Sequence, residues 1–174
     1  MENTQQPTTK KYALNYGLLI GGVGIIFSLM LHFMDMQYDQ SAGKTIISTL
    51  ILVVLVVLAI YQFKKANGGL LSLGDALKVG MGAAAIAALI TVLYLLLYVN
   101  VIDPDFHEKV AEMSRAGMLK NNPEMSQEQM DQTIEMQQKF FWVTYPVVLI
   151  LNIFVGFVVS LITGLIMKKS DQQL

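Results

Sequence analysis

The sequence contains no cysteine among its 174 residues. This absence excludes a disulfide framework, a thiol nucleophile and every metal site built on thiolates. It also excludes the four-helix membrane oxidoreductases that work through cysteine pairs. With no cysteine present, the count says nothing about the redox compartment of the protein.

Charged residues are missing from four long stretches. Only 14% of the residues are Asp, Glu, Lys or Arg, whereas 54% are hydrophobic. The charge-free stretches are residues 12–34, 46–63, 79–102 and 143–167. A helix rises about 1.5 Å per residue and bilayer hydrocarbon is about 30 Å thick, so about 20 apolar residues can cross it. The sequence therefore predicts an all-α polytopic membrane protein, a single membrane domain over residues 1–174 with four transmembrane helices in a lipid bilayer.

The first stretch follows Lys10 and Lys11, as the apolar part of a signal peptide would. Its apolar run is too long for that role, and its exit lacks small residues at cleavage spacing. We expect an uncleaved first helix.

Basic residues gather on one side of the predicted spans. Because Lys and Arg next to span ends stay in the cytoplasm, both termini and the turn at residues 64–78 are predicted to be cytoplasmic. Seven lysines fall on this side with three acidic residues, whereas five basic and ten acidic residues fall on the other. The seven are Lys10, Lys11, Lys64, Lys65, Lys78, Lys168 and Lys169. The net charge of −1 thus combines two oppositely charged faces, a pattern typical of topology and lipid anchoring.

The predicted cytoplasmic turn brings helix-ending and helix-starting residues close together. The run Asn67-Gly68-Gly69 tolerates the positive φ of a helix C-cap and is predicted to end the second helix. Ser72 followed three residues later by Asp75 resembles a capping box, so the third helix is predicted to start near Leu73. The alternative is that Asp75 pairs with Lys78 and binds a proton or a cation at the membrane surface.

Small residues recur at intervals of four within three of the spans, which predicts helix faces where neighbouring backbones come close. The packing candidates are Gly17 and Gly21 in the first helix, Gly80, Ala84 and Ala88 in the third, and Asn152, Gly156, Ser160 and Gly164 in the fourth. Asn152 is predicted to hydrogen-bond across helices. The second helix has almost no small residues and is predicted to lie at the periphery, facing lipid. The stripes fit packing within one chain or between the copies of a homo-oligomer.

The predicted spans carry no Asp, Glu, Lys or Arg, so they offer no nucleophile paired with a base. His32 is interpreted as an interfacial residue beside Asp35, the alternatives being a proton relay or a metal ligand. We therefore predict no catalytic, cofactor-binding or metal-binding residues, no nucleic-acid partner and no enzymatic activity.

The only sizeable polar segment covers residues 103–140. Asp103 is predicted to cap a helix that has Pro104 at its first position, and residues 121–123 break that helix. Ser126 and Gln129 have the spacing of a capping box for a second helix. The segment therefore predicts an acidic, extracytoplasmic helical hairpin with an aromatic belt at its base. Pro146 then permits a kink where the chain enters the bilayer.

Methionines are concentrated in this predicted hairpin. Thioethers select Cu(I), so a copper site is one interpretation. Met is also an adaptable surface for a partner helix and a common packing residue, and all three interpretations stay open. The residues are Met113, Met118, Met125, Met130 and Met136, with His107 nearby.

Several of these features together resemble the domain of unknown function 4199 family, over nearly the whole chain. The resemblance implies a small four-helix inner-membrane protein of the kind found mainly in Bacteroidota. It implies no established activity, so no site residues are transferred. It rests on the turn from Lys64-Lys65-Ala66-Asn67-Gly68-Gly69 to Gly80, on Asp103-Pro104-Asp105-Phe106, on Met125-Ser126-Gln127-Glu128-Gln129, on Pro146, on Ser160-Leu161-Ile162 and on Lys168-Lys169.

Three classes of function follow from these patterns. We favour a non-enzymatic interaction or assembly protein of the bacterial envelope that binds a protein partner through the acidic periplasmic hairpin. The alternative is an oligomeric small-solute transporter or channel, suggested by the glycine stripes, because four helices alone enclose little space. An intramembrane enzyme is the third class and is not expected. The sequence does not specify a ligand, a partner or a process.

Overall fold

The computed structural model describes residues 7–38 and 42–169 and is all-helical over this part of the chain, apart from a single β-bridge between Leu71 and Lys169. Glu2, Asp39 and Asp171, which enter the charge count above, lie outside the described residues. In chain order the elements are α1 (Thr9–Phe33), α2 (Ala42–Ala66), α3 (Leu73–Leu97), the π-helical turn η1 (Tyr98–Ile102), α4 (Phe106–Asn121), α5 (Gln127–Lys139), the 3₁₀ turn η2 (Phe141–Val143) and α6 (Thr144–Met167).

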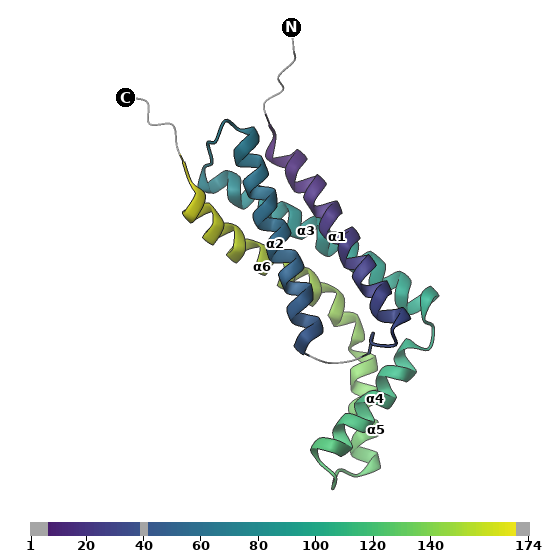
Figure 1. Ribbon diagram of the computed structural model, residues 1–174. Coiled ribbons are helices and arrows are strands. Elements are labelled where there is room, and N and C mark those ends of the chain that lie inside the picture. Colours follow the sequence, from purple (N-terminus) through teal and green to yellow (C-terminus); the bar gives the residue numbers. More distant parts are fainter. Residues whose placement is uncertain (1–6, 39–41, 170–174) are drawn as a thin grey trace.

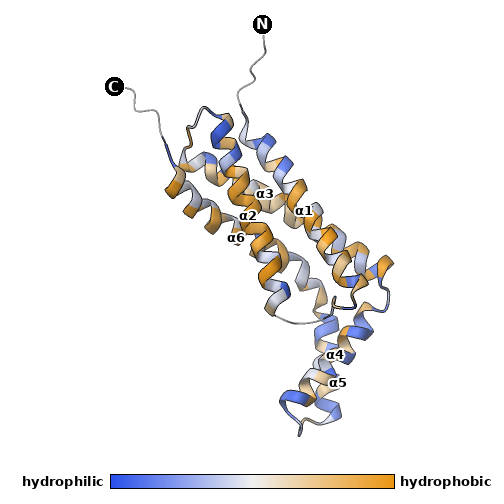
Figure 2. Cartoon of the chain, in the orientation of Figure 1, coloured by the Kyte–Doolittle hydropathy of each residue, from blue (hydrophilic) through white to orange (hydrophobic). Residues whose placement is uncertain are grey.

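Four helical segments are long and apolar enough to cross a membrane: Thr9–Phe33, Ala42–Ala66, Leu73–Ile102 and Phe141–Met167. They correspond to the four charge-free stretches, which confirms the all-helical, four-span prediction. The helices continue past the ends of those stretches, because polar side chains at a helix end can reach the interface while the backbone stays helical. Figure 2 shows apolar residues along the bundle and hydrophilic residues toward its two ends.

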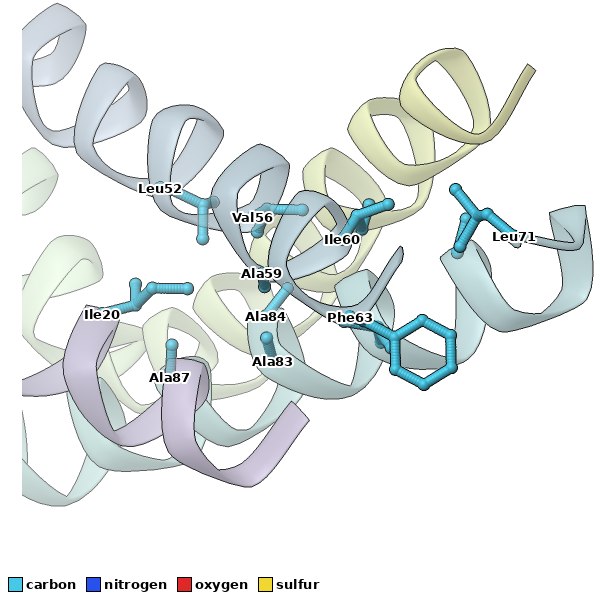
Figure 3. Packing of buried hydrophobic residues seen from close by; sticks show 12 residues of the cluster. Ile20, Leu52, Val56, Ala59, Ile60, Phe63, Leu71, Ala83, Ala84 and Ala87 are labelled. Carbon is cyan, nitrogen blue, oxygen red and sulfur yellow. The ribbon is translucent and has the colours of Figure 1, made fainter. Parts of the chain in front are cut away.

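α3 is the central helix of the bundle. α1 and α6 pack along different faces of α3, and α2 contacts all three (Figure 1). α3 packs most extensively against α1 and α6, and α2 contacts these helices less, in line with its predicted peripheral position. The prediction that α2 faces lipid is wrong for one of its faces, because Val56, Ala59 and Ile60 have no exposed surface. Figure 3 shows Ala59 of α2 beside Ala84 of α3. Composition failed here because lipid tails are as apolar as a protein core, so a Leu- and Val-rich helix fits either surrounding.

The bundle is packed unevenly along its length. Most buried residues lie in the first halves of α1 and α3 and in the second halves of α2 and α6, which is the half nearest residues 7 and 169 (Figure 1). Leu52, Ala87 and Ala88 are buried just beyond the midpoints of α2 and α3. Farther into the opposite half, the buried residues among the described parts of the four-helix bundle are Leu31, Tyr98 and Val99. The four helices therefore pack closely at one end and more loosely at the other.

Lys64 ties the α2–α3 turn to the end of α6. Its Nζ donates a hydrogen bond to the Met167 carbonyl at 2.8 Å, beside the bridge between Leu71 and Lys169. The start of α1, the α2–α3 turn and the end of α6 thus lie at one end of the bundle. The α4–α5 pair, α4 and α5 side by side, extends from the opposite end (Figure 1).

Candidate functional site

A groove of about 670 Å³ runs along the α4–α5 pair. Its apolar lining includes Ala111 and Ile134, which are buried, and five carboxylates surround it. α4 and α5 bury only a few apolar side chains between them. The remaining faces of both helices are polar and exposed. The groove is lined by Pro104, Asp105, His107, Glu108, Ala111, Glu112, Arg115, Asp131, Ile134, Glu135 and Gln138.

The groove has an excess of negative charge. Arg115 is its only cation among the described residues, and Arg115 Nη2 lies 2.7 Å from Asp131 Oδ1. This pair links α4 to α5, although both side chains are about half exposed, so it adds about 0–1 kcal/mol. Over the described parts of the chain, Glu108, Glu112 and Glu135 form no ion pair. Among the described residues, Asp105 is also exposed and forms no ion pair, so four of the five carboxylates remain available for a basic group.

Asp103 lies at the base of the α4–α5 pair and is 4% exposed. Lys109 Nζ donates a hydrogen bond to Asp103 Oδ1 at 2.7 Å. This bond is the main reason why the pKa of Lys109 is raised above its ordinary value of 10.5. Asp103, Asp105 and Asp35 add to the effect through their charges, while desolvation opposes it. The bond between the Asp103 carboxylate and the Lys109 ammonium group therefore ties the start of α4 to a residue that precedes it.

The predicted N-cap at Asp103 and Pro104 is wrong by two residues. α4 begins at Phe106, and Asp105 is its N-cap residue without a side-chain capping bond. The Asp103 carbonyl instead accepts a bond from the Phe106 amide at 3.0 Å, which closes a turn around Pro104. The carboxylate was predicted to cap the helix, but Lys109 engages it, so a tertiary contact overrides the local signal.

An aromatic cluster joins the α4–α5 pair to the bundle. Phe106 lies with ring centroids 5.8 Å from Tyr38, 6.0 Å from Tyr98 and 5.7 Å from Phe141. His107 meets Phe141 edge-on at 4.8 Å. Of the predicted aromatic belt, Phe140 and Trp142 are exposed, whereas Phe141 turns into this cluster. Aromatic pairs in such arrangements stabilise a contact by about 0.5–1.5 kcal/mol each beyond the area that they bury.

His32 reaches the same cluster. Its Nδ1 shares a hydrogen bond of 2.7 Å with Tyr98 Oη, and the two rings lie edge-on at 5.5 Å. The bond connects the end of α1 to η1. No group of three or more His, Cys, Asp or Glu able to hold a metal ion occurs among residues 7–38 and 42–169.

The methionines of the α4–α5 pair do not share one environment. Met130 is buried, Met118 and Met125 are partly buried, and Met113 and Met136 are exposed. Packing within the pair accounts for Met130, while the exposed methionines offer apolar contact area on its surface.

The other predicted caps lie where the pattern placed them. Ser126 Oγ accepts from the Gln129 amide at 3.3 Å and Gln129 Oε1 accepts from the Ser126 amide at 3.1 Å, a reciprocal capping box. Ser72 Oγ accepts from the Asp75 amide at 3.0 Å, but its hydroxyl donates to Asp75 Oδ2, so this cap is not the reciprocal form. Gly68 and Gly69 follow α2 with φ of +65° and +82°.

The small residues lie at contacts within the chain. A Cβ on Gly17 would come within 2.6 Å of Ile86 Cβ, and one on Gly21 within 2.7 Å of Ile90 Cδ1, both on α3. On the other face of α3, Gly156 lies against Ala84, and Gly80 lies against Ser160. Ala88 is fully buried, and a Cβ on Gly164 would lie 2.8 Å from Ala76 Cβ.

Asn152 departs from its stripe. Its predicted bond across helices is wrong, because its Nδ2 donates to the Val148 carbonyl of its own helix at 2.8 Å. Below the close-packed half, where the helices separate, Asn152 lines a cavity of about 360 Å³ together with Ser28, Thr91 and Tyr94. Sequence reasoning missed this cavity. Its signal is the set of neutral polar residues inside the spans, but their convergence depends on how each helix is rotated.

Four long apolar helices with polar segments at both ends define a multi-pass membrane protein. Within that class, the chain belongs to the family described as Protein of unknown function (DUF4199), whose family model matches residues 15–169. This match confirms the resemblance seen in the sequence. No curated protein and no solved structure matches the chain.

Proposed function

We propose that this chain is a non-enzymatic interaction protein of the bacterial inner membrane, and that it binds a basic segment of a partner protein in the groove of the α4–α5 pair. In this proposal both termini are cytoplasmic and the pair stands on the periplasmic side. The observation that carries it is the groove itself, with unpaired exposed carboxylates around buried Ala111 and Ile134.

Charge complementarity identifies the chemistry of the partner. Lys or Arg side chains can pair with Glu108, Glu112 and Glu135, while aliphatic groups cover the apolar floor. Such pairing steers encounter and fixes orientation more than it adds affinity. An amphipathic helix in a groove between two helices is an established mode of peptide recognition.

The orientation is supported by the lysine distribution. The described lysines predicted to be cytoplasmic flank spans at the bundle end opposite the α4–α5 pair (Figure 1). Lysine-rich span ends stay in the cytoplasm during insertion. An even number of spans places both termini on the same side of the membrane.

The experiment begins with the tagged chain purified from its own host in native nanodiscs, with mass spectrometry of the proteins retained. A photo-crosslinking amino acid at Gln138, which lines the groove, then locates the contact. The informative variant neutralises the groove through Glu108→Gln, Glu112→Gln and Glu135→Gln. The matched control changes Glu124→Gln and Glu128→Gln, two exposed acids of the same segment outside the groove.

We expect one stoichiometric adduct from position 138, at least tenfold weaker in the groove variant and unchanged in the control, with a yield that falls as salt is raised. Equal adducts from both variants would contradict the proposal. So would the recovery of only lipid and further copies of the chain, which would favour the oligomeric transporter instead.

A further inference from the structure

The loosely packed half of the bundle contains a cavity that the proposed partner binding does not use. It measures about 360 Å³ and lies between α1, α2, α3 and α6. Ligand pockets for small molecules begin near 300 Å³. Aliphatic side chains such as Leu52 and Leu95 make up much of its lining, and the polar residues that line it are Ser28, Gln37, Lys44, Ser48, Thr91, Tyr94, Tyr98 and Asn152.

Tyr94 provides the first of these polar groups. Its hydroxyl is buried and has no hydrogen-bond partner in the described part of the chain. Buried polar atoms nearly always find a partner, and the hydrocarbon of a bilayer supplies no water to serve as one. The hydroxyl has almost no accessible surface, so a ligand reaches it only when the Tyr94 side chain turns toward the cavity that it lines. A polar atom of the ligand would then satisfy this hydroxyl.

Asn152 and Thr91 add further hydrogen-bonding capacity. Asn152 uses one amide N–H on Val148, which leaves its other N–H and its carbonyl oxygen available to the cavity that it lines. Thr91 donates to the Ala87 carbonyl at 2.9 Å and keeps its lone pairs for accepting. Among the described lining residues there is no carboxylate to hold a cation. Lys44 is the one charged residue of the lining, and its Nζ donates a hydrogen bond to the Gln37 carbonyl at 2.7 Å. The neutral polar groups of the lining therefore suit an uncharged head group.

The route into the cavity leads to lipid. A neighbouring pocket of about 380 Å³ shares Ser48, Leu52 and Asn152 with it and continues between α2 and α6 to Leu151, which is 56% exposed. The first ten residues of α2 contain no buried side chain, so this side of the bundle is open to the bilayer.

We propose that this cavity binds one uncharged, single-chain amphiphile from the bilayer, whose hydroxyl or ester head group hydrogen-bonds Tyr94 and Asn152. The ligand enters sideways between α2 and α6. The binding site and the groove of the α4–α5 pair are separate, so each can be tested without the other.

Gly24 offers a clean way to close the cavity. It lines the cavity, and a Cβ built on it meets nothing within 4 Å, so there is open space where a side chain would begin. Gly22, two residues earlier on α1, also has nothing within 4 Å but does not line the cavity. Gly24→Phe and Gly22→Phe therefore form a matched pair, and equal thermal melts in detergent show that both fold.

The probe is a 1-monoacylglycerol with a diazirine in its acyl chain, added to the full chain in nanodiscs of phosphatidylcholine and photolysed. Peptide mass spectrometry should place the label around Leu52 and Leu95, with competition by unlabelled monooleoylglycerol. We expect at least tenfold less labelling there in Gly24→Phe and no change in Gly22→Phe. Labelling spread evenly over the lipid-facing surfaces, or equal in both variants, would overturn the proposal.

Tyr94→Phe tests the head group separately. It should weaken labelling by the monoacylglycerol several-fold while leaving labelling by a diazirine-bearing alkane unchanged. An equal effect on both probes would mean that the hydroxyl does not bind the head group. A fatty acid probe that competes better than monooleoylglycerol would overturn the assignment of an uncharged ligand.

Discussion

Gly156 shows how little space separates the helices in the close-packed half. A methyl group there would collide with Ala84 across the contact between α3 and α6, and the neighbouring Gly80 faces Ser160 in the same way. In lipid, association of helices depends on this close packing rather than on the hydrophobic effect. Individual small residues therefore determine the stability of the bundle.

Gly156→Val should destabilise the protein by about 1–3 kcal/mol, the usual cost of overpacking. Gly22→Val is the control, because its new side chain meets no neighbour within 4 Å and the residue type is the same. The free energy of unfolding, measured by titration with a denaturing detergent, should fall clearly only for Gly156→Val. Equal losses in the two variants would mean that the effect comes from helix propensity rather than packing.

The bond between Lys109 and Asp103 makes the stability of the first turns of α4 depend on pH in the alkaline range. Its folded-state pKa is raised above 10.5 by the hydrogen bond to Asp103, so folding favours the charged form. The stabilisation is fully present below the unfolded pKa and is lost as the pH rises through the folded pKa. Lys109→Met should therefore lower the melting temperature at pH 7–9, and this difference should shrink as the pH rises above 10.5 and through the raised pKa of Lys109.

Lys120→Met, a change of an exposed lysine in the last turn of the same helix, is the control for that titration. It should shift the melting temperature little at any pH. A difference between Lys109→Met and the wild type that stays constant up to pH 12 would argue against the pair as its source.

At the scale of elements, most predictions of helix caps from neighbouring residues were right, whereas predictions that depended on contacts between distant residues were not. Ser126 and Ser72 cap α5 and α3 as predicted, because a cap needs only residues within one turn. Asp103 failed as a cap because Lys109 holds its carboxylate. The prediction that α2 faces lipid does not hold for its buried face, because the sequence does not distinguish contact with lipid from contact with α3.

Ser126→Ala should destabilise α5 by about 0.5–2 kcal/mol, since it removes the acceptor for the Gln129 amide. Hydrogen exchange at the first turn of α5 should accelerate accordingly. Ser126→Asp should restore most of the protection, because Asp also caps well and favours the positive end of the helix. Unchanged exchange in Ser126→Ala would show that packing alone holds this turn.

At the scale of the molecule, hydropathy predicted the number and order of the spans, and the orientation inferred from charge stays a prediction. The cavity was not predictable, because Tyr94, Thr91 and Asn152 are far apart in sequence or on different helices, and only the rotation of each helix brings them together. The groove was predicted only as an acidic segment, and its apolar floor depends on how α4 and α5 pair.

The absence of cysteine makes the orientation directly testable. Single cysteines introduced by Asn67→Cys in the α2–α3 turn and Asn122→Cys after α4 can be labelled with a membrane-impermeant maleimide in intact spheroplasts. Position 122 should react at once and position 67 only after permeabilisation, because lysine-rich ends stay in the cytoplasm. The reverse pattern would mean that the protein has the opposite orientation in the membrane. Immediate reaction at both positions would contradict an odd number of crossings between them.

The uneven packing of the bundle also bears on the membrane around it. Helices that meet closely at one end and separate at the other occupy unequal cross-sections in the two leaflets. We expect such a wedge to respond to lateral pressure, because lipids that crowd the wider leaflet would push the separated ends of α2 and α6 together. On this expectation, the shape of the surrounding lipids becomes a variable that affects how far these ends separate.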